Sequence, residues 1–360
     1  MHCTVKILDW YIIRKFLGTY IFAIVLILAI TVMFDINEKL DAFLKAPLKA
    51  TVFDYFVNFL PYFANQFSPL FTFIAVIFFT SKLADNSEII AMLSTGMSYN
   101  RLLRPYMVSA AVIAAATYVL SAYIIPPANI KRIDYTNTYG KNKRIYYGTN
   151  IQLQVAKGEI AYMSRYDNTQ KTGYKFSLEK FEGKRLVSRL TAQSIRWDTL
   201  HNWTVRDYMI RDFDGQRENI RRGLRLDTVI PFEPRDFLIS KNDHETMTSP
   251  ELRAYIESQK ARGVANIKSF EIENHRRYAM TAAAFILTVI GMALSSRKIK
   301  GGMGVNIGIG LVLSFSYILF MTVTSTFAIS GATSPMVAMW IPNVLYAVIA
   351  VVLYYRVSHR

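Results

Sequence analysis

Long stretches without a formal charge constrain this chain more than any other feature. Asp, Glu, Lys and Arg are missing from residues 16–34, 55–81, 105–130, 278–296 and 301–355. Roughly 20 consecutive apolar residues in a helix cross the hydrocarbon core of a bilayer. Each of the first four stretches is long enough for one crossing, and the last for two, with a turn at 330–335. The sequence therefore predicts six transmembrane helices, three on each side of a polar segment.

Two other readings of these stretches are disfavoured. The first stretch is longer than the apolar part of a secretion signal, and no small-residue cleavage site follows it. We therefore expect it to remain as a span. Buried helices of a soluble protein usually keep a polar stripe, which these stretches lack.

Basic residues in short loops predict the orientation, because they gather on the cytoplasmic side. With the N-terminus inside, the inner segments hold Lys6, Arg14, Lys15, Lys82, Arg101, Arg104, Arg297, Lys298, Lys300, Arg356 and Arg360. The short outer loops hold only Lys39, Lys45 and Lys49. We expect a multi-pass protein with both termini in the cytoplasm and residues 131–277 outside. Much of the net charge of +16 then lies on the wrong side of the membrane for nucleic-acid binding.

The expected organisation is an α-helical membrane protein with an inserted all-β domain. Residues 1–130 hold transmembrane helices 1–3, with a cytoplasmic helix at about 85–96. Residues 131–248 form the β domain, 249–277 an interfacial helix and linker, and 278–360 transmembrane helices 4–6. The boundaries follow the changes in composition.

Alternating apolar and polar residues predict the β structure. Tyr174, Phe176 and Leu178 share one face of a strand, and Glu182-Gly-Lys184 follows as a hairpin turn. The same period continues around Leu190, and another strand begins near Trp203. Short strands at this spacing indicate a sandwich or an open barrel.

Two short helices flank these parts. Ser249-Pro-Glu251 is a helix start, and Gly263 suits the position after its end. In the loop after the second span, Asp85-Asn86 is expected to cap a helix that ends at Gly96. This second helix either lies flat on the inner leaflet or docks a cytoplasmic partner.

Motifs for catalysis and cofactor binding are missing from the sequence. It has no P-loop, no H-E-x-x-H, no G-x-S-x-G, and a single cysteine, Cys3. The five histidines lack ligand spacing, so we expect no metal site, no cofactor and no enzymatic activity. The charge-free stretches also disfavour proton-driven transport, which normally needs an ionisable group within a span.

Basic residues recur where the spans meet the outer face. They are Lys39, Lys45, Lys49, Lys131, Arg132, Arg276 and Arg277. These side chains either anchor the helices among lipid headgroups or form a cationic rim that binds the phosphates of an anionic lipid.

Four local motifs resemble the lipopolysaccharide-export permease family, LptF and LptG. They are Leu8-Asp-Trp-Tyr-Ile12; Leu83-Ala-Asp-Asn-Ser-Glu88-Ile-Ile-Ala-Met92 with Gly96 and Arg101-Leu-Leu-Arg-Pro105; residues 252–263; and Glu273-Asn-His-Arg-Arg277. The resemblance covers essentially the whole chain, and the first motif is more LptG-like. Where the family often has a proline early in the fourth span, this chain has Ala279-Met-Thr281.

The resemblance implies a permease subunit that takes lipopolysaccharide from the inner membrane. Its expected partners are a cytoplasmic LptB-like ATPase, a second permease of the same family and a periplasmic bridge protein. It also implies a jelly-roll-like periplasmic domain. The implied lipid-binding residues are Lys39, Lys131, Arg132, Arg276 and Arg277, and the implied ATPase-coupling residues are Ser87, Glu88, Ile89, Ala91, Met92, Leu93 and Gly96, with Glu88 the main contact.

Three other functions are less well supported. A lipoprotein-releasing permease would have four spans rather than a three-plus-three arrangement. A membrane scaffold or sensor with a ligand-binding β domain needs no ATPase, so association with an ATPase separates it from an exporter. An enzyme acting on lipid would need a catalytic motif.

Overall fold

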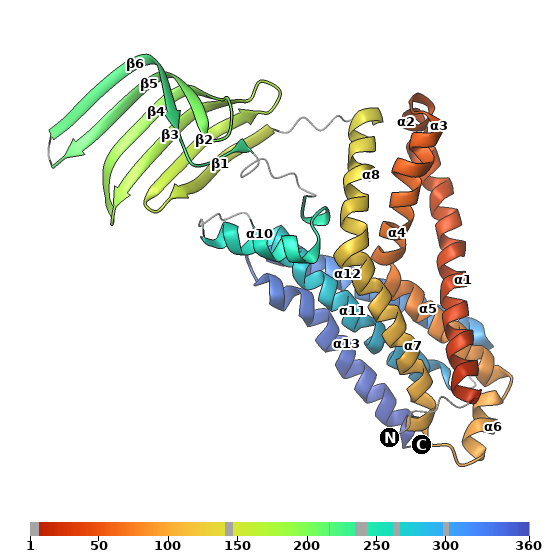
Figure 1. Cartoon of the computed structure of the whole chain (residues 1–360). Helices are drawn as coiled ribbons and strands as arrows, with labels where there is room; N and C mark the ends of the chain where they lie inside the picture. The colour runs from red at the N-terminus through yellow and green to blue at the C-terminus, as the bar shows by residue number, and fades with distance from the viewer. Residues whose placement is uncertain are drawn as a thin grey trace. The chain divides into compact units, whose positions relative to one another are not determined.

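The protein consists of two compact units in a computed structural model (Figure 1). The structure describes residues 7–140, 147–215, 217–234, 243–261, 267–297 and 302–359. The first unit, here the helical unit, comprises Met1–Lys141, Glu245–Ser249 and Lys268–Arg360, and the second, here the sheet unit, comprises Asn142–His244 and Pro250–Ile267.

Six helices of the described residues are long and apolar enough to cross a membrane, as the sequence predicts. They are Ile7–Glu38 (α1), Ser68–Asp85 (α5), Tyr99–Tyr139 (α7 Tyr99–Val119, η2 Leu120–Ile124 and α8 Ile125–Tyr139), Lys268–Ser295 (α11), Gly304–Ser330 within α12 (Gly302–Ser330), and Pro335–Ser358 (α13). The turn expected at 330–335 is confirmed between α12 and α13, where Gly331 has a φ of +89°.

The second and third spans are interrupted. The second charge-free stretch, residues 55–81, runs from the π-helical η1 (Thr51–Phe56) through α4 (Val57–Gln66) to α5, with a break at Phe67. The short helices α2 (Leu40–Lys45) and α3 (Leu48–Ala50) precede it. Pro69 stands in the first turn of α5, and Pro126 in the first turn of α8, directly after the π-helical η2. Proline has no N–H and disturbs the preceding turn, which explains why regular α-helix stops at these points.

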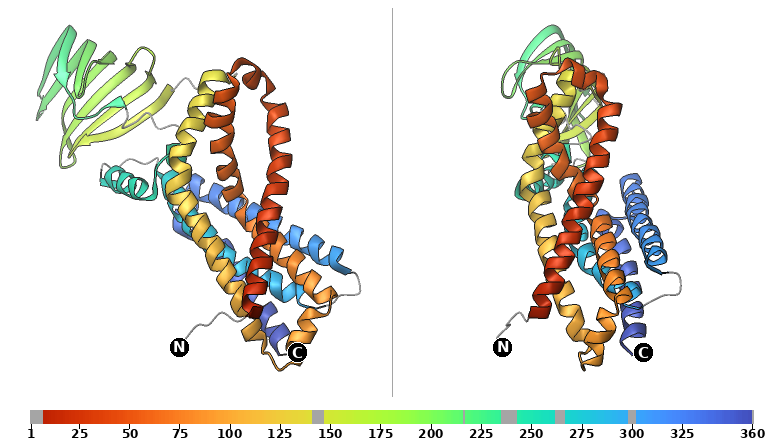
Figure 2. Two further views of the ribbon diagram at one scale, coloured as in Figure 1. Left: turned by 45° about the vertical axis from the view of Figure 1, so that its right-hand side comes forward. Right: turned by 90° about the vertical axis from the view of Figure 1, so that its right-hand side faces the viewer.

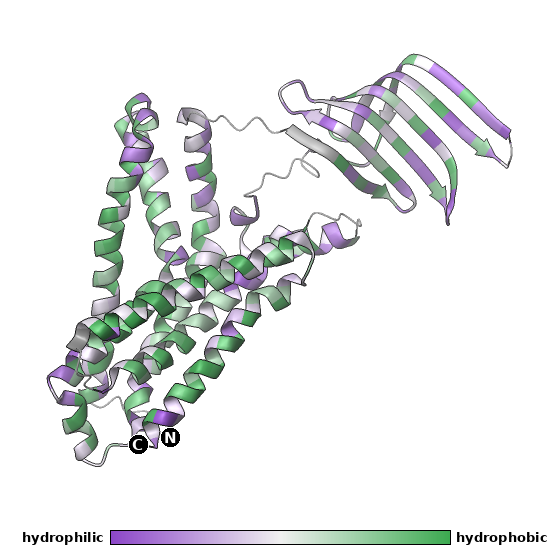
Figure 3. Ribbon diagram, turned by 180° about the vertical axis from the view of Figure 1, so that it is seen from behind, coloured by the Kyte–Doolittle hydropathy of each residue, from purple (hydrophilic) through white to green (hydrophobic). Residues whose placement is uncertain are grey.

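The core of the helical unit is built around α11, which contacts α5, α7, α12 and α13. One buried cluster joins α11 to α1, α5 and α7 around Phe16, Tyr106 and Met292. A second joins it to α12 and α13 around Tyr317 and Tyr346. Figure 2 shows α4 and α8 side by side, and contacts join the two helices. The outward faces stay apolar, as for a surface in lipid: Phe22, Leu319 and Val351 are exposed, and Figure 3 shows these helices in green.

The sheet unit is a single six-stranded antiparallel sheet in the order β1-β2-β3-β4-β5-β6. The strands are Tyr147–Ala156 (β1), Glu159–Asp167 (β2), Thr172–Glu182 (β3), Arg185–Trp197 (β4), Asn202–Asp214 (β5) and Arg217–Val229 (β6). The expected strands near Leu190 and Trp203 are confirmed, as is the turn at Gly183, which has a φ of +64°. The sequence predicts a sandwich or an open barrel. The described residues form one open sheet of six strands.

This sheet bends along a line that crosses its strands. Lys175 in β3 and Asp207 in β5 have left-handed backbones, with φ of 52° and 50°. Neighbouring strand residues normally point to opposite faces, yet Ala192 and Ile195, three positions apart, are buried in the same cluster. The left-handed residues therefore shift the alternation, so that one face stays apolar on both sides of the bend. The curvature is visible in Figure 1.

Short helices complete the description. The loop after α5 carries α6 (Glu88–Ser94), and η3 (Asp243–Glu245) precedes α10 (Ser249–Ala261). The helix start expected at Ser249 is confirmed, whereas Gly263 lies outside the described residues.

Candidate functional site: a polar cluster at the start of α11

Arg277 forms a buried ion pair at the start of α11. Its Nε donates to Glu273 Oε1 at 3.0 Å, one helical turn earlier. Its two Nη groups donate to Ser249 Oγ and to the carbonyl of Met247, both at 2.9 Å. Arg277 is 3% exposed and Glu273 6%. All of its nitrogens are thus engaged, and the guanidinium attaches the segment before α10 to α11.

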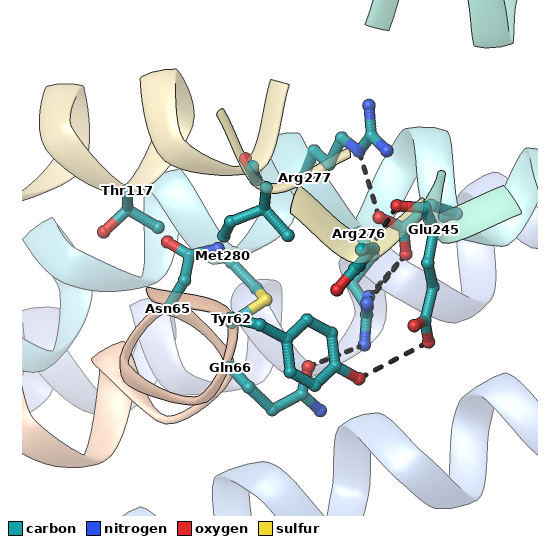
Figure 4. A pocket seen from close by; sticks show the side chains of 12 residues that line it. Tyr62, Asn65, Gln66, Thr117, Glu245, Arg276, Arg277 and Met280 are labelled. Carbon is teal, nitrogen blue, oxygen red and sulfur yellow. Dashed lines mark hydrogen bonds and ion pairs between the residues drawn. The ribbon is translucent and has the colours of Figure 1, made fainter. Parts of the chain in front are cut away.

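Arg276 binds the other oxygen of the same carboxylate. Its Nε donates to Glu273 Oε2 at 2.9 Å, and its Nη1 donates to Gln66 Oε1 on α4 at 3.2 Å. One carboxylate therefore holds two adjacent arginines. Figure 4 shows this arrangement, with Glu245 and Tyr62 beside it.

Arg132 is brought to this cluster by α8. Its Nη2 lies 3.5 Å from Glu245 Oε2, and its guanidinium lies over the Tyr62 ring, 4.1 Å from the centroid. The Tyr62 hydroxyl donates to Glu245 Oε1 at 3.4 Å, and Asn129 donates to the Glu245 carbonyl at 3.2 Å. These side-chain contacts are longer than those of Glu273, so Glu245 is the more loosely held carboxylate.

A small cavity lies within this cluster. It has a volume of about 30 Å³ and is lined by residues of α4, α7, η2, α8 and α11 together with Glu245. Asn65 and Asn129 line it, and each has a buried side-chain oxygen without a hydrogen-bond partner among the described residues. Such a cavity holds about one or two water molecules, so in this conformation it is too small for a lipid headgroup.

The two lysines among the expected lipid-binding residues, Lys39 and Lys131, do not line this cavity. Lys39 follows α1, where its Nζ contacts the Asp35 carboxylate and the Tyr55 hydroxyl, 5.0 Å from the centre of the Tyr55 ring. Lys131 is exposed on α8. The structure thus joins Arg132, Arg276 and Arg277 in one cluster and leaves the lysines outside it.

Charge is missing from the middle of the spans but not from their ends. Asp35 in α1, and Glu273 and Arg277 in α11, are buried although they belong to long helices. The helices extend beyond the charge-free stretches, which is why counting those stretches missed the buried charges.

The second candidate site is the expected ATPase-coupling helix, α6. Ser87 precedes it with a φ of 61°, and no side chain caps the helix, so the cap expected from Asp85-Asn86 is wrong. Gly96, with a φ of +85°, ends the segment as expected. Ser87, Ala91, Leu93 and Gly96 are exposed, Glu88 and Met92 are half-buried, and Ile89 is buried in the helical unit.

Hydrogen bonds connect α6 and α7 to the first helix. The Tyr11 hydroxyl donates to Glu88 Oε2 at 3.1 Å, and Arg101 binds both oxygens of Asp9 at 2.7 and 2.6 Å. These bonds join the first motif of the family resemblance to the second.

Sequence reasoning missed several members of both sites. Glu245 and Tyr62 carry no local pattern that relates them to Arg132. Glu273 could have been found, because it lies three and four residues before the arginines, the spacing of ion pairs on a helix. Ile90 is not among the expected coupling residues, although it lies in α6 and is 57% exposed.

Comparison with known families identifies the chain. The family model described as lipopolysaccharide export system permease LptF/LptG matches residues 10–356. The chain belongs to this family. Membership, together with the six apolar helices, makes it a transport permease and a multi-pass inner-membrane protein. The match covers LptF and LptG alike, so the LptG-like assignment stays a prediction. No curated protein matches the chain.

Proposed function

We propose that this chain is a permease subunit that extracts lipopolysaccharide from the inner membrane and passes it to a periplasmic bridge protein. A separate LptB-like ATPase on the cytoplasmic side drives it, and a second permease of the family completes the complex. The family match over residues 10–356 carries this proposal. The distribution of basic residues supports cytoplasmic termini and a periplasmic sheet unit.

We assign ATPase coupling to α6. Ile89 anchors the helix in the helical unit, which leaves Ile90 and Leu93 exposed, at 57% and 36%, while Glu88 in the first turn is half-buried. Exposed apolar side chains on a helix that also carries a carboxylate suit a protein partner better than water. Six of the seven expected coupling residues are exposed or half-buried and therefore accessible to a partner. The seventh, Ile89, is buried and holds the helix in place.

We assign lipid phosphate binding to the polar cluster. Arg132 and Arg276 are the basic residues that could change partners, with the exposed Lys131 near Arg132 on α8. Arg277 and Lys39 position their neighbours instead. The side chain of Arg277 is 2% exposed, against 25% for Arg276, and Lys39 is held by both Asp35 and Tyr55. Guanidinium groups bind phosphate and carboxylate with the same geometry. Glu245 therefore occupies the place of a lipid phosphate, and lipid entry displaces it.

Replacing Glu245 by glutamine tests this displacement. Without its charge, we expect photo-crosslinking of lipopolysaccharide near Arg132 to rise about threefold, the scale of a weak ion pair. The matched control is Glu257→Gln, which removes an exposed carboxylate of α10. Unchanged crosslinking in Glu245→Gln, or an equal rise in the control, contradicts the displacement.

We propose edge-strand pairing for the bridge protein. β1 and β6 are the edges of the sheet, and an edge strand presents unpaired N–H and C=O groups to another chain. Co-expression with the ATPase and the second permease, followed by ATP-dependent release of lipopolysaccharide from proteoliposomes, tests the whole function. Ligand binding to the sheet unit without any associated ATPase favours the scaffold or sensor instead.

A further inference from the structure

The sheet carries a polar depression that the export function does not use. It has a volume of about 450 Å³ and is lined by Gln170, Thr172, Tyr174, Ser194, Arg196 and Arg206. All six side chains are neutral or cationic. The volume falls within the range of small-molecule sites, roughly 300–1,000 Å³.

Strand register places these residues on one face. Tyr174 pairs with Ser194, and Ser194 with Arg206, across β3, β4 and β5. Thr172 and Arg196 form the next row on the same face. The intervening row contains Ile195 and Val205, which are buried in the core of the sheet. The depression therefore lies on the face turned away from that core.

The positive charge in this depression is not balanced locally. Arg196 and Arg206 are diagonal neighbours on adjacent strands, where like charges repel. Neither has an ion pair within the part of the chain that the structure describes. Four other arginines of the sheet do have a carboxylate partner: Arg189 with Glu179, Arg211 with Glu218, Arg221 with Asp212, and Arg225 with Asp227.

The carboxylate in register with this row on β6, Asp227, is already in use. Asp227 lies two strands from Arg196, since both pair with Thr204. A hydrogen bond from the Thr204 hydroxyl, together with Arg225, holds the pKa of Asp227 below its usual value. On the other side, Asp167 is buried and accepts hydrogen bonds from the backbone of Thr169 and Gln170.

We propose that this depression binds the phosphate group of a phosphate monoester, between the guanidinium groups of Arg196 and Arg206. Arginine binds phosphate through paired hydrogen bonds. The Ser194 hydroxyl, directly opposite Arg206, supplies a further donor. The half-buried ring of Tyr174 forms an apolar wall beside the site, and its hydroxyl donates to Gln170 Oε1 at 3.0 Å. This site is independent of lipid extraction and of the ATPase.

Calorimetric titration of the full-length chain in detergent tests the proposal. The probes are inorganic phosphate, glucose 6-phosphate and, as a control, glucose. We expect saturable binding of both phosphates and none of glucose. Tighter binding of glucose 6-phosphate identifies a phosphorylated sugar as the preferred source, and equal binding identifies the phosphate group alone. Absence of saturable binding for both phosphates overturns the site.

Variants separate this site from general charge attraction. Arg196→Gln and Arg206→Gln should each weaken phosphate binding about tenfold, the scale of one charge-assisted hydrogen bond. Arg221→Gln, which removes an exposed arginine that already pairs with Asp212, should leave the affinity unchanged. An equal loss in Arg221→Gln overturns the proposal.

A third variant tests the site independently, in case the arginine variants fail to fold. Ser194→Asp places a carboxylate opposite Arg206 and should abolish phosphate binding while raising the melting temperature. Retained phosphate affinity in a folded Ser194→Asp protein also overturns the site.

Discussion

Replacing Glu88 by lysine should abolish co-purification of the partner ATPase while leaving the permease folded in the membrane. The Glu88 carboxylate accepts hydrogen bonds from Tyr11 and Asn86 at 3.1 and 3.2 Å, which fix its position at the first turn of α6. Ile90, in the same helix, is exposed. If α6 is the proposed coupling helix, reversing the charge of Glu88 places a cation where the partner would meet an anion, and such a mismatch costs several kcal/mol, or about a hundredfold or more in affinity. Pull-down from detergent measures the loss.

Two controls sharpen this experiment. Tyr11→Phe removes only the hydrogen bond that positions Glu88, so we expect a smaller loss than with the lysine. Glu257→Lys makes the same charge reversal on an exposed part of α10 and should leave the ATPase bound. Full recovery of ATPase with Glu88→Lys would show that α6 is not the coupling element.

Replacing Arg277 by glutamine should cost about 3–5 kcal/mol of stability, the usual cost of leaving one member of a buried ion pair unpartnered. The glutamine is too short to satisfy Glu273, Ser249 and the Met247 carbonyl together. Arg276→Gln should cost less, because the side chain of Arg276 is 25% exposed whereas that of Arg277 is 2% exposed. Thermal unfolding in detergent measures both.

A double replacement tests the cause of this loss. Arg277→Met combined with Glu273→Leu removes both charges of the buried pair, and apolar replacement of such a pair is often neutral or stabilising. Arg276 also loses its carboxylate partner in this variant, but its side chain is 25% exposed, so its charge is solvated by water. We therefore expect the double variant to be more stable than Arg277→Gln. Equal stability of Arg276→Gln and Arg277→Gln would show that burial of the pair is not what makes Arg277 important.

The membrane helices were predictable because their signal is local. A segment that crosses the bilayer has to satisfy its backbone hydrogen bonds within itself, so a long uncharged apolar stretch predicts a helix without knowledge of its neighbours. Prolines in the spans predict kinks or breaks, but not which proline interrupts the helix. Regular α-helix stops before Pro69 and Pro126, whereas Pro61 and Pro342 stand inside α4 and α13. The strands near Leu190 and Trp203 followed from alternation, but the bend at Lys175 and Asp207 did not. A left-handed backbone is uncommon for any residue other than glycine, even though Asp adopts it more often than Lys.

The candidate site was only half predictable, for a related reason. Basic residues at the ends of helices are visible in the sequence, whereas their carboxylate partners depend on tertiary structure. Glu245 meets Arg132 although 113 positions separate them. The sequence therefore indicates which cations are present without showing which of them are already engaged.

The π-helical turn η2 determines which way the basic end of α8 points. A π turn contains one residue more than an α turn, and each residue advances the helix by about 100°. In an uninterrupted helix, Asn129 and Arg132 would be rotated by that angle relative to α7. Restoring regular α-helix over 120–124 without removing a residue would therefore turn both side chains away from Glu245 by about 100°, whereas deleting one residue there would keep them in place. The conformation of this short segment, as much as the identity of the arginine, specifies the contact.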